Sequence, residues 1–235
     1  MNREYHRWYS QHLGRDMELL IFGHGGTPYV VFPSSMGSFY EYEDTGMVSA
    51  IAEKLRHGLV QLFCVSSADR ESWYNRGAHP RHRVDRALAY EQYLLNDVLP
   101  LVRGRNGHGL GVTGCSFGAY QALALALRHP DLVSSCVVMS GAYDIHPFLD
   151  GYYDQDCYFL SPADFLPGLE DAWYLDRYRS TKWVLATGEH DICLRENERM
   201  SNLLTAKGIP NSLHVWQGMW HDWPWWQRMA QAYLP

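Results

Sequence analysis

The chain carries the pattern G-x-S-x-G at Gly114-Cys115-Ser116-Phe117-Gly118. Residues 109–113 form a short apolar segment bounded by glycines, which is typical of a buried strand. Residues 117–129 are rich in alanine and leucine and end before a proline, so they predict a helix. Ser116 therefore falls at a tight turn from a strand into a helix. That is the context in which this pattern presents a serine hydroxyl as a nucleophile.

Strand and helix patterns alternate on both sides of this unit. Strands are predicted at 29–32, 59–65, 109–113, 133–140, 183–187 and 213–216, and helices at 46–57, 83–102, 117–129, 193–207 and 223–233. Alternation of this kind predicts an α/β fold with a mostly parallel central sheet and helices on both faces. Residues 4–12 and 16–22 add an antiparallel pair of strands at the N-terminal edge.

The length of 235 residues predicts a single domain over 1–235. Residues 145–180 read as irregular and aromatic, with one helix from Glu170 to Arg179. They are the candidate for a small cap insertion. The turn at His24-Gly25-Gly26 is predicted to be a hairpin turn rather than part of the reactive site, because it precedes its strand.

The composition restricts the partners. The net charge of -6 argues against nucleic acid. No apolar run is long enough for a membrane span. The N-terminus lacks a signal-peptide core, and the five scattered cysteines contain no C-x-x-C, so a cytoplasmic location is expected. We expect a small-molecule substrate and no metal or organic cofactor. A homo-oligomer is left open.

A serine nucleophile needs a general base, and His221 is the best candidate. It lies in the loop between the last predicted strand and the last predicted helix, where the base of this fold belongs. His129 ends a helix and His214 lies inside a strand, so structural roles are expected for both. Asp222 is expected to cap the final helix.

The imidazole in turn needs a carboxylate to orient it. Asp191 follows the strand 183–187 and lies between the serine and the histidine in the chain, as the order of this fold requires. Asp144, after the preceding strand, is the main rival, and Glu189 is a lesser one. The predicted triad is therefore Ser116, Asp191 and His221.

An oxyanion hole needs two backbone N–H donors. One is expected from Phe117, the residue after the nucleophile. The other should come from the loop after the strand 29–32, with Ser35 favoured and Met36 next. Cys115 is expected to be buried behind the turn rather than to act as a second nucleophile.

These segments resemble the esterase branch of the α/β-hydrolase superfamily, which includes esterase D (S-formylglutathione hydrolase), feruloyl and enterochelin esterases, and mycolyltransferases. The resemblance rests on residues 114–118, on the aspartate of 188–191, on the histidine of 221–226 and on the loop 32–41. It covers nearly the whole chain. Small bacterial members with a stretch like Asp156 to Pro167 are the most similar. In many members the loop is richer in glycine, whereas this chain has Ser35-Met36 before Gly37.

The predicted triad and the resemblance together indicate a serine carboxylic-ester hydrolase that forms an acyl-enzyme. A chain of 235 residues leaves no room for a large lid domain, so we expect an open cleft and short-chain or aryl esters. Ser72-Trp73-Tyr74 resembles an aromatic segment beside the mycolyltransferase cleft, and Met36, Trp73 and Tyr158 are the candidate substrate-binding residues. Three alternatives remain open: an acyltransferase with the same triad, a peptidase, and a non-catalytic binding protein on a hydrolase scaffold.

Overall fold

The computed structural model describes residues 2–235. Its centre is a sheet of eight strands in the order β1-β2-β4-β3-β5-β6-β7-β8. The strands are β1 (Arg3–Ser10), β2 (Arg15–Phe22), β3 (Thr27–Phe32), β4 (Val60–Val65), β5 (Leu110–Cys115), β6 (Val133–Met139), β7 (Lys182–Gly188) and β8 (Ser212–Trp216). β1 pairs with β2 and β2 with β4 in antiparallel fashion, and all other pairs are parallel. The predicted mostly parallel sheet with an antiparallel N-terminal edge is confirmed.

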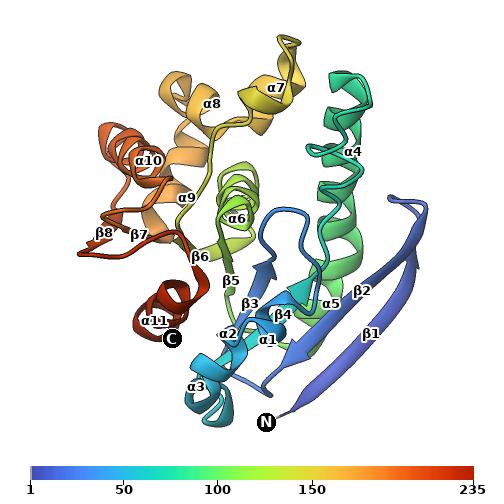
Figure 1. The fold of residues 1–235 in the computed structure, drawn as a ribbon, viewed down its shortest axis with the longest axis vertical. Coiled ribbons are helices and arrows are strands. Elements are labelled where there is room, and N and C mark those ends of the chain that lie inside the picture. Colours follow the sequence, from blue (N-terminus) through green and yellow to red (C-terminus); the bar gives the residue numbers. More distant parts are fainter. Residues whose placement is uncertain (1) are drawn as a thin grey trace.

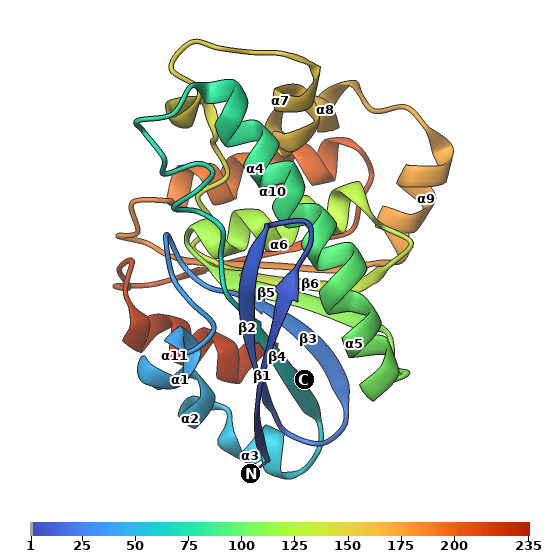
Figure 2. The same cartoon turned by 90° about the vertical axis from the view of Figure 1, so that its right-hand side faces the viewer.

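Helices cover both faces of the sheet. They are α1 (Glu41–Asp44), α2 (Met47–Ala50), α3 (Ala52–Arg56), α4 (Pro80–Tyr93), α5 (Leu99–Arg105), α6 (Phe117–Arg128), α7 (Gln155–Leu160), α8 (Pro162–Gly168), α9 (Ala172–Ser180), α10 (Leu194–Ala206) and α11 (Trp223–Tyr233). Figure 2 shows α1, α2, α3 and α11 on one face, and α4, α6 and α10 on the other. Two apolar clusters, one on each face, form the core.

The helix α6 lies at the centre of the larger apolar cluster. Ten of its twelve residues are buried and are either apolar or glycine. They span Phe117 to Leu127, with the exception of the polar Gln121. A helix that is apolar on all sides is stable only where protein surrounds it. This burial fixes the start of α6 directly beyond the end of β5 (Figure 1).

Three sequence predictions differ from the structure in detail. The helix predicted at 46–57 is broken at Ile51, whose backbone leaves the helical region, and ends at Gly58 with φ +64°. The helix predicted at 83–102 continues from α4 through a π-helical turn at Leu94–Val98 into α5. Pro100 lies just after that turn and cannot donate an N–H, so the wider turn accommodates it. The turn at residues 24–26 is not a hairpin turn, because β4 lies between β2 and β3.

The segment 145–180 is more helical than predicted. It contains α7 and α8 in addition to α9, which was expected. Asp154 accepts a hydrogen bond from the N–H of Cys157 and so caps α7, and Asp171 caps α9 in the same way. Short helices with local caps carry too few turns for a clear apolar period, which explains why the pattern looked irregular. Within residues 2–235 we find no helix with the length and hydropathy of a membrane span.

Candidate active site

Ser116 lies at the sharp turn between β5 and α6. Its backbone has φ 56° and ψ −121°, a strained conformation for a residue with a side chain. Both glycines of the motif are required by close backbone packing. A Cβ on Gly114 would lie 2.4 Å from the carbonyl carbon of Gly118, and one on Gly118 would lie 2.4 Å from the carbonyl oxygen of Pro33. The motif therefore brings the serine turn into contact with the loop after β3.

His221 lies in the loop between β8 and α11. Its Nε2 is 2.9 Å from Ser116 Oγ. The side chain of Asp222, the next residue, accepts a hydrogen bond from the N–H of Trp223, which confirms the predicted helix cap. Because the cap fixes the start of α11, it also fixes the loop that presents the imidazole.

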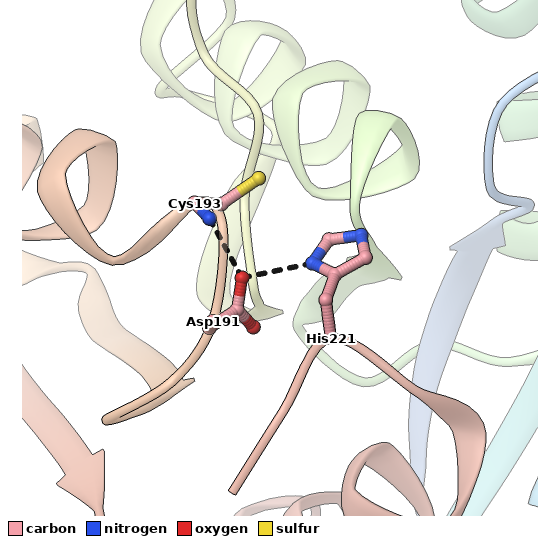
Figure 3. A group of neighbouring side chains, drawn as sticks. All are labelled: Asp191, Cys193 and His221. Atoms are coloured by element: carbon pink, nitrogen blue, oxygen red, sulfur yellow. Dashed lines mark hydrogen bonds and ion pairs between the residues drawn. The ribbon is translucent and has the colours of Figure 1, made fainter.

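Asp191 follows β7 and faces the other nitrogen of the imidazole. Its Oδ1 is 2.9 Å from His221 Nδ1 and also accepts the N–H of Cys193 at 2.7 Å, as Figure 3 shows. The side chain is fully buried. Burial alone would raise the pKa of Asp191, but the hydrogen bonds from His221 and from the Cys193 N–H outweigh it and hold the pKa below the ordinary value. The carboxylate is therefore ionised and able to accept a hydrogen bond from the Nδ1–H of His221.

The rival residues lie in other surroundings. Asp144 is bonded to the ring of its neighbour His146, and Glu189 accepts the N–H of Gly218. His129 contacts Glu91, and the ring of His214 stacks on Tyr233. The structure thus brings together the three residues favoured from the sequence, and none of these four contacts them through a hydrogen bond.

Two residues that the sequence analysis did not single out support the acid and the base. The indole ring of Trp226 packs edge-on against His221, with the ring centroids 4.9 Å apart. Its Nε1–H donates to Ser140 Oγ at 2.8 Å. Ser140 follows β6 and has φ 52°, and its N–H bonds back to Ala186 of β7. Trp226 therefore connects the loop of His221 to the ends of β6 and β7. Its position among several tryptophans at the start of α11 does not reveal this role in the sequence.

The loop Pro33–Ser38 after β3 is held by two carboxyl groups. Glu41 accepts the N–H of Ser34 at 2.7 Å and its hydroxyl at 2.8 Å. Asp69 accepts the N–H of Met36 at 2.8 Å. The carboxyl group of Glu41 fits because Gly37 has no side chain, since a Cβ there would lie 2.5 Å from Glu41 Oε1. The N–H of Ser35, between the two bonded groups, has no hydrogen-bond partner within residues 2–235.

An aromatic cluster lies beside this loop. The hydroxyl of Tyr74 donates to Ser35 Oγ at 2.6 Å. Its ring packs against Phe117, with centroids 5.5 Å apart, and against Phe148 at 4.9 Å. Phe117 and Phe148 also contact each other at 5.3 Å. These rings link residues 74 and 148 to the start of α6.

The three candidate substrate-binding residues differ in position. Met36 lies on the loop Pro33–Ser38 with 43% of its surface exposed and φ 57°. Trp73 is buried against Tyr120 and Phe148, so it supports the cluster from behind rather than facing solvent. Tyr158, on α7, packs against its neighbour Phe159, which lies outside the loop Pro33–Ser38 and is not one of Ser116, Asp191 and His221.

Cysteines near the serine are buried. Cys115 is fully buried and contacts the hydroxyl of Tyr42, as expected for a residue behind the turn. Burial raises the pKa of the Cys193 thiol to about 12. One oxygen of Asp191, the sulfur of Cys193 and one ring nitrogen of His221 lie within 4.8 Å of one another, so these atoms could contact one metal ion. Two of the three, however, already bond each other as acid and base.

The sequence matches the family described as "Putative esterase" over residues 10–232. The chain belongs to this esterase family. Its reaction class is therefore carboxylic ester hydrolysis. No curated protein sequence matches it significantly. A ferulic acid esterase is similar in structure, with a TM-score of 0.79 and 15% identity over 100% of this chain and 96% of that one.

Two further solved structures share the fold of this esterase. The S-formylglutathione hydrolase from Agrobacterium tumefaciens has a TM-score of 0.73 and 15% identity, covering 99% of this chain and 92% of its own. MPT51 (FbpC1) from Mycobacterium tuberculosis has a TM-score of 0.69 and 14% identity, covering 99% and 96%. The α/β-hydrolase fold and the resemblance to the esterase branch are confirmed.

Proposed function

We propose that this esterase hydrolyses its substrate through an acyl-enzyme on Ser116. His221 Nε2 accepts the hydroxyl proton as Ser116 Oγ attacks the ester carbonyl, and the resulting imidazolium returns that proton to the leaving alcohol. Asp191 holds the Nδ1–H tautomer and stabilises the cation. The observation that carries the proposal is the unbroken chain of two 2.9 Å contacts from Ser116 through His221 to a buried carboxylate.

The negative charge that develops on the carbonyl oxygen is accepted by two backbone N–H groups, those of Phe117 and Ser35. Phe117 begins α6, whose positive dipole end favours an anion. Ser35 is supported over Met36 because the Met36 N–H already bonds Asp69. Water then attacks the acyl-enzyme, with His221 as general base, and releases the acid.

The surroundings of Ser116 support short-chain or aryl esters. Tyr74, Phe117 and Phe148 fill the space beside Ser35, which leaves little room for a long acyl chain on that side. The loops that carry the oxyanion donor, the acid and the base also carry exposed apolar side chains, namely Met36 (43% exposed), Ile192 (83%) and Trp220 (59%). Such a rim suits an apolar ester that reaches the serine from solvent.

The segment 145–180 is proposed as a small cap. Its first part reaches the serine turn through Phe148, which contacts Phe117. In Figure 1, α7 and α8 extend beyond the end of the sheet from which α6 begins. Removal of the Phe148 ring should therefore change the preference for acyl length more than it changes the reactivity of Ser116.

The test is a panel of p-nitrophenyl esters from acetate to octanoate, with Ser116→Ala as the control. The proposal predicts the highest kcat/KM for the shortest chains and a loss of about 10⁴-fold or more in Ser116→Ala. Equal turnover by the wild type and Ser116→Ala would refute it. Added alcohols test the acyltransferase alternative, because a transferase would release mainly the new ester and little free acid.

A further inference from the structure

The carboxyl group of Asp69 is buried and takes no direct part in the proposed reaction. It lies in the loop after β4, 33 residues beyond Met36 of the loop Pro33–Ser38, which we call the oxyanion loop, and is 1% exposed. Its two oxygens bond two different elements. Oδ2 accepts the N–H of Met36 at 2.8 Å, and Oδ1 accepts an N–H of the Gln121 side-chain amide, with Nε2 at 2.6 Å.

These two partners belong to the two elements that carry the oxyanion donors. Met36 follows Ser35 directly in the oxyanion loop. Gln121 lies one helical turn beyond Phe117 on α6. Asp69 therefore connects the segment of one donor to the helix of the other through a single rigid carboxyl group. We propose that Asp69 is a positioning residue that sets the distance between the Ser35 and Phe117 N–H groups. This inference rests on the proposed function.

The conformation of the loop needs such a restraint. Met36 has φ 57°, in the left-handed region that side chains disfavour by roughly 1 kcal/mol. The bond from the Met36 N–H to Asp69 offsets this penalty. The bond also withdraws the Met36 N–H from the reaction. Glu41 accepts the N–H of Ser34. Among the N–H groups of Ser34, Ser35 and Met36, only that of Ser35 has no hydrogen-bond partner within residues 2–235, so it is free to meet the substrate.

The group can hold the loop in either protonation state. Burial raises the pKa of Asp69 to about 7, and the hydrogen bonds from Met36 and Gln121 oppose that rise. Oε1 of Gln121 is buried and has no hydrogen-bond partner in the described part of the chain. A protonated Asp69 could donate to that oxygen if the amide is turned over, while Oδ2 keeps the Met36 N–H. A neutral group of the same shape should therefore replace Asp69.

The experiment compares Asp69→Ala with Asp69→Asn. Asparagine keeps an oxygen for the Met36 N–H, whereas alanine removes it. With p-nitrophenyl acetate, Asp69→Ala should lower kcat by about 10- to 100-fold and change KM by less than about threefold, because an oxyanion hole acts mainly on the transition state. Asp69→Asn should stay within about threefold of the wild type in both.

The same two variants can overturn the proposal. Wild-type kcat in a folded Asp69→Ala enzyme would do so, and so would an equal loss of kcat in Asp69→Asn. If Asp69→Ala does not fold, Gln121→Leu decides, because it cuts only the link to α6. It should lower kcat several-fold at unchanged KM, and wild-type kcat would refute the positioning role.

Failure of the proposed function gives a different result. In that case the wild type and Ser116→Ala would turn over the ester at the same rate, and the Asp69 proposal would fall with it. A wild type that depends on Ser116 but is indifferent to Asp69 overturns only the positioning role.

Discussion

The serine turn at residues 114–118 and the proposed oxyanion loop at residues 33–38 meet at the same site, but different interactions determine their conformations. The turn is determined locally. Its two glycines let backbone segments pass within contact, and α6 follows at once. The loop is held by side chains that lie far away in the sequence, Asp69 and Tyr74 among them. A sequence motif can therefore encode the first, whereas only the folded chain defines the second.

The largest effect expected is on the acid of the triad. Asp191→Asn should lower kcat by about 10⁴-fold, because the amide favours the wrong imidazole tautomer while the packing is preserved. Steady-state kinetics with p-nitrophenyl acetate measures the loss. Asp144→Asn is the matched control, since Asp144 is exposed and bonds His146 instead. Normal turnover in Asp191→Asn, or a comparable loss in Asp144→Asn, would show that the acid is assigned wrongly.

The contact between the two regions can be broken at Gly118. In Gly118→Ala the new Cβ would lie 2.4 Å from the Pro33 carbonyl oxygen and 2.5 Å from that of Phe32, so turn and loop must move apart. We expect kcat to fall about 100-fold. The free energy of unfolding should fall by about 1–3 kcal/mol.

Gly104→Ala provides the control for that variant. Gly104 lies on α5, and a Cβ there meets nothing within 4 Å. Its kcat should be unchanged, and its stability equal or higher by up to about 1 kcal/mol. Denaturant unfolding and kinetics on both variants complete the test. A Gly118→Ala enzyme as active as Gly104→Ala would mean that the turn and the loop are not coupled through this contact.

The smallest effect concerns the dependence of stability on pH. The native pKa of Asp69 is raised to about 7 from 3.8, so between these values the native state keeps a proton that the unfolded chain has released. The contribution of Asp69 to the free energy of unfolding is therefore complete below about pH 4 and is lost as the pH rises toward about 7. The loss is at most about 1.4 kcal/mol for each pH unit.

Asp69→Asn removes this titration. We expect the stability of the wild type to fall relative to that of Asp69→Asn between about pH 4 and pH 7, and the difference to level off above pH 7. Urea unfolding at several pH values measures both proteins. Parallel curves across the window would contradict a raised pKa in the native state and would leave Asp69 as an ordinary ionised carboxylate.

The contrast between the two regions also explains what the sequence could predict. Periodicity predicts the order of strands and helices. Chain order then indicates Ser116, Asp191 and His221, because each of them follows the end of a predicted strand. The sequence favours Ser35 over Met36 as the second donor, but the physical reason for that choice, the bond from the Met36 N–H to Asp69, exists only in the fold. Asp69 itself lies in a polar stretch that reads like any exposed loop, and its burial exists only in the fold.

Helices α7 and α8 were not predicted, for a related reason. They are short, and α8 ends one residue after Pro167, so their stability comes from tertiary packing and, in α7, from the Asp154 cap, rather than from a repeated apolar face. The position of Trp73 likewise depends on tertiary packing that the sequence does not show. Its aromatic segment resembles one beside a cleft, but its side chain packs into the core against Tyr120.

The central claim is that His221 activates Ser116 as a nucleophile. The most direct measurement is the intact mass of the protein after treatment with a fluorophosphonate, followed by peptide mapping. The account predicts a single adduct on Ser116, absent in Ser116→Ala and formed far more slowly in His221→Ala. An adduct that persists in Ser116→Ala, or a wild type that forms none, would contradict it.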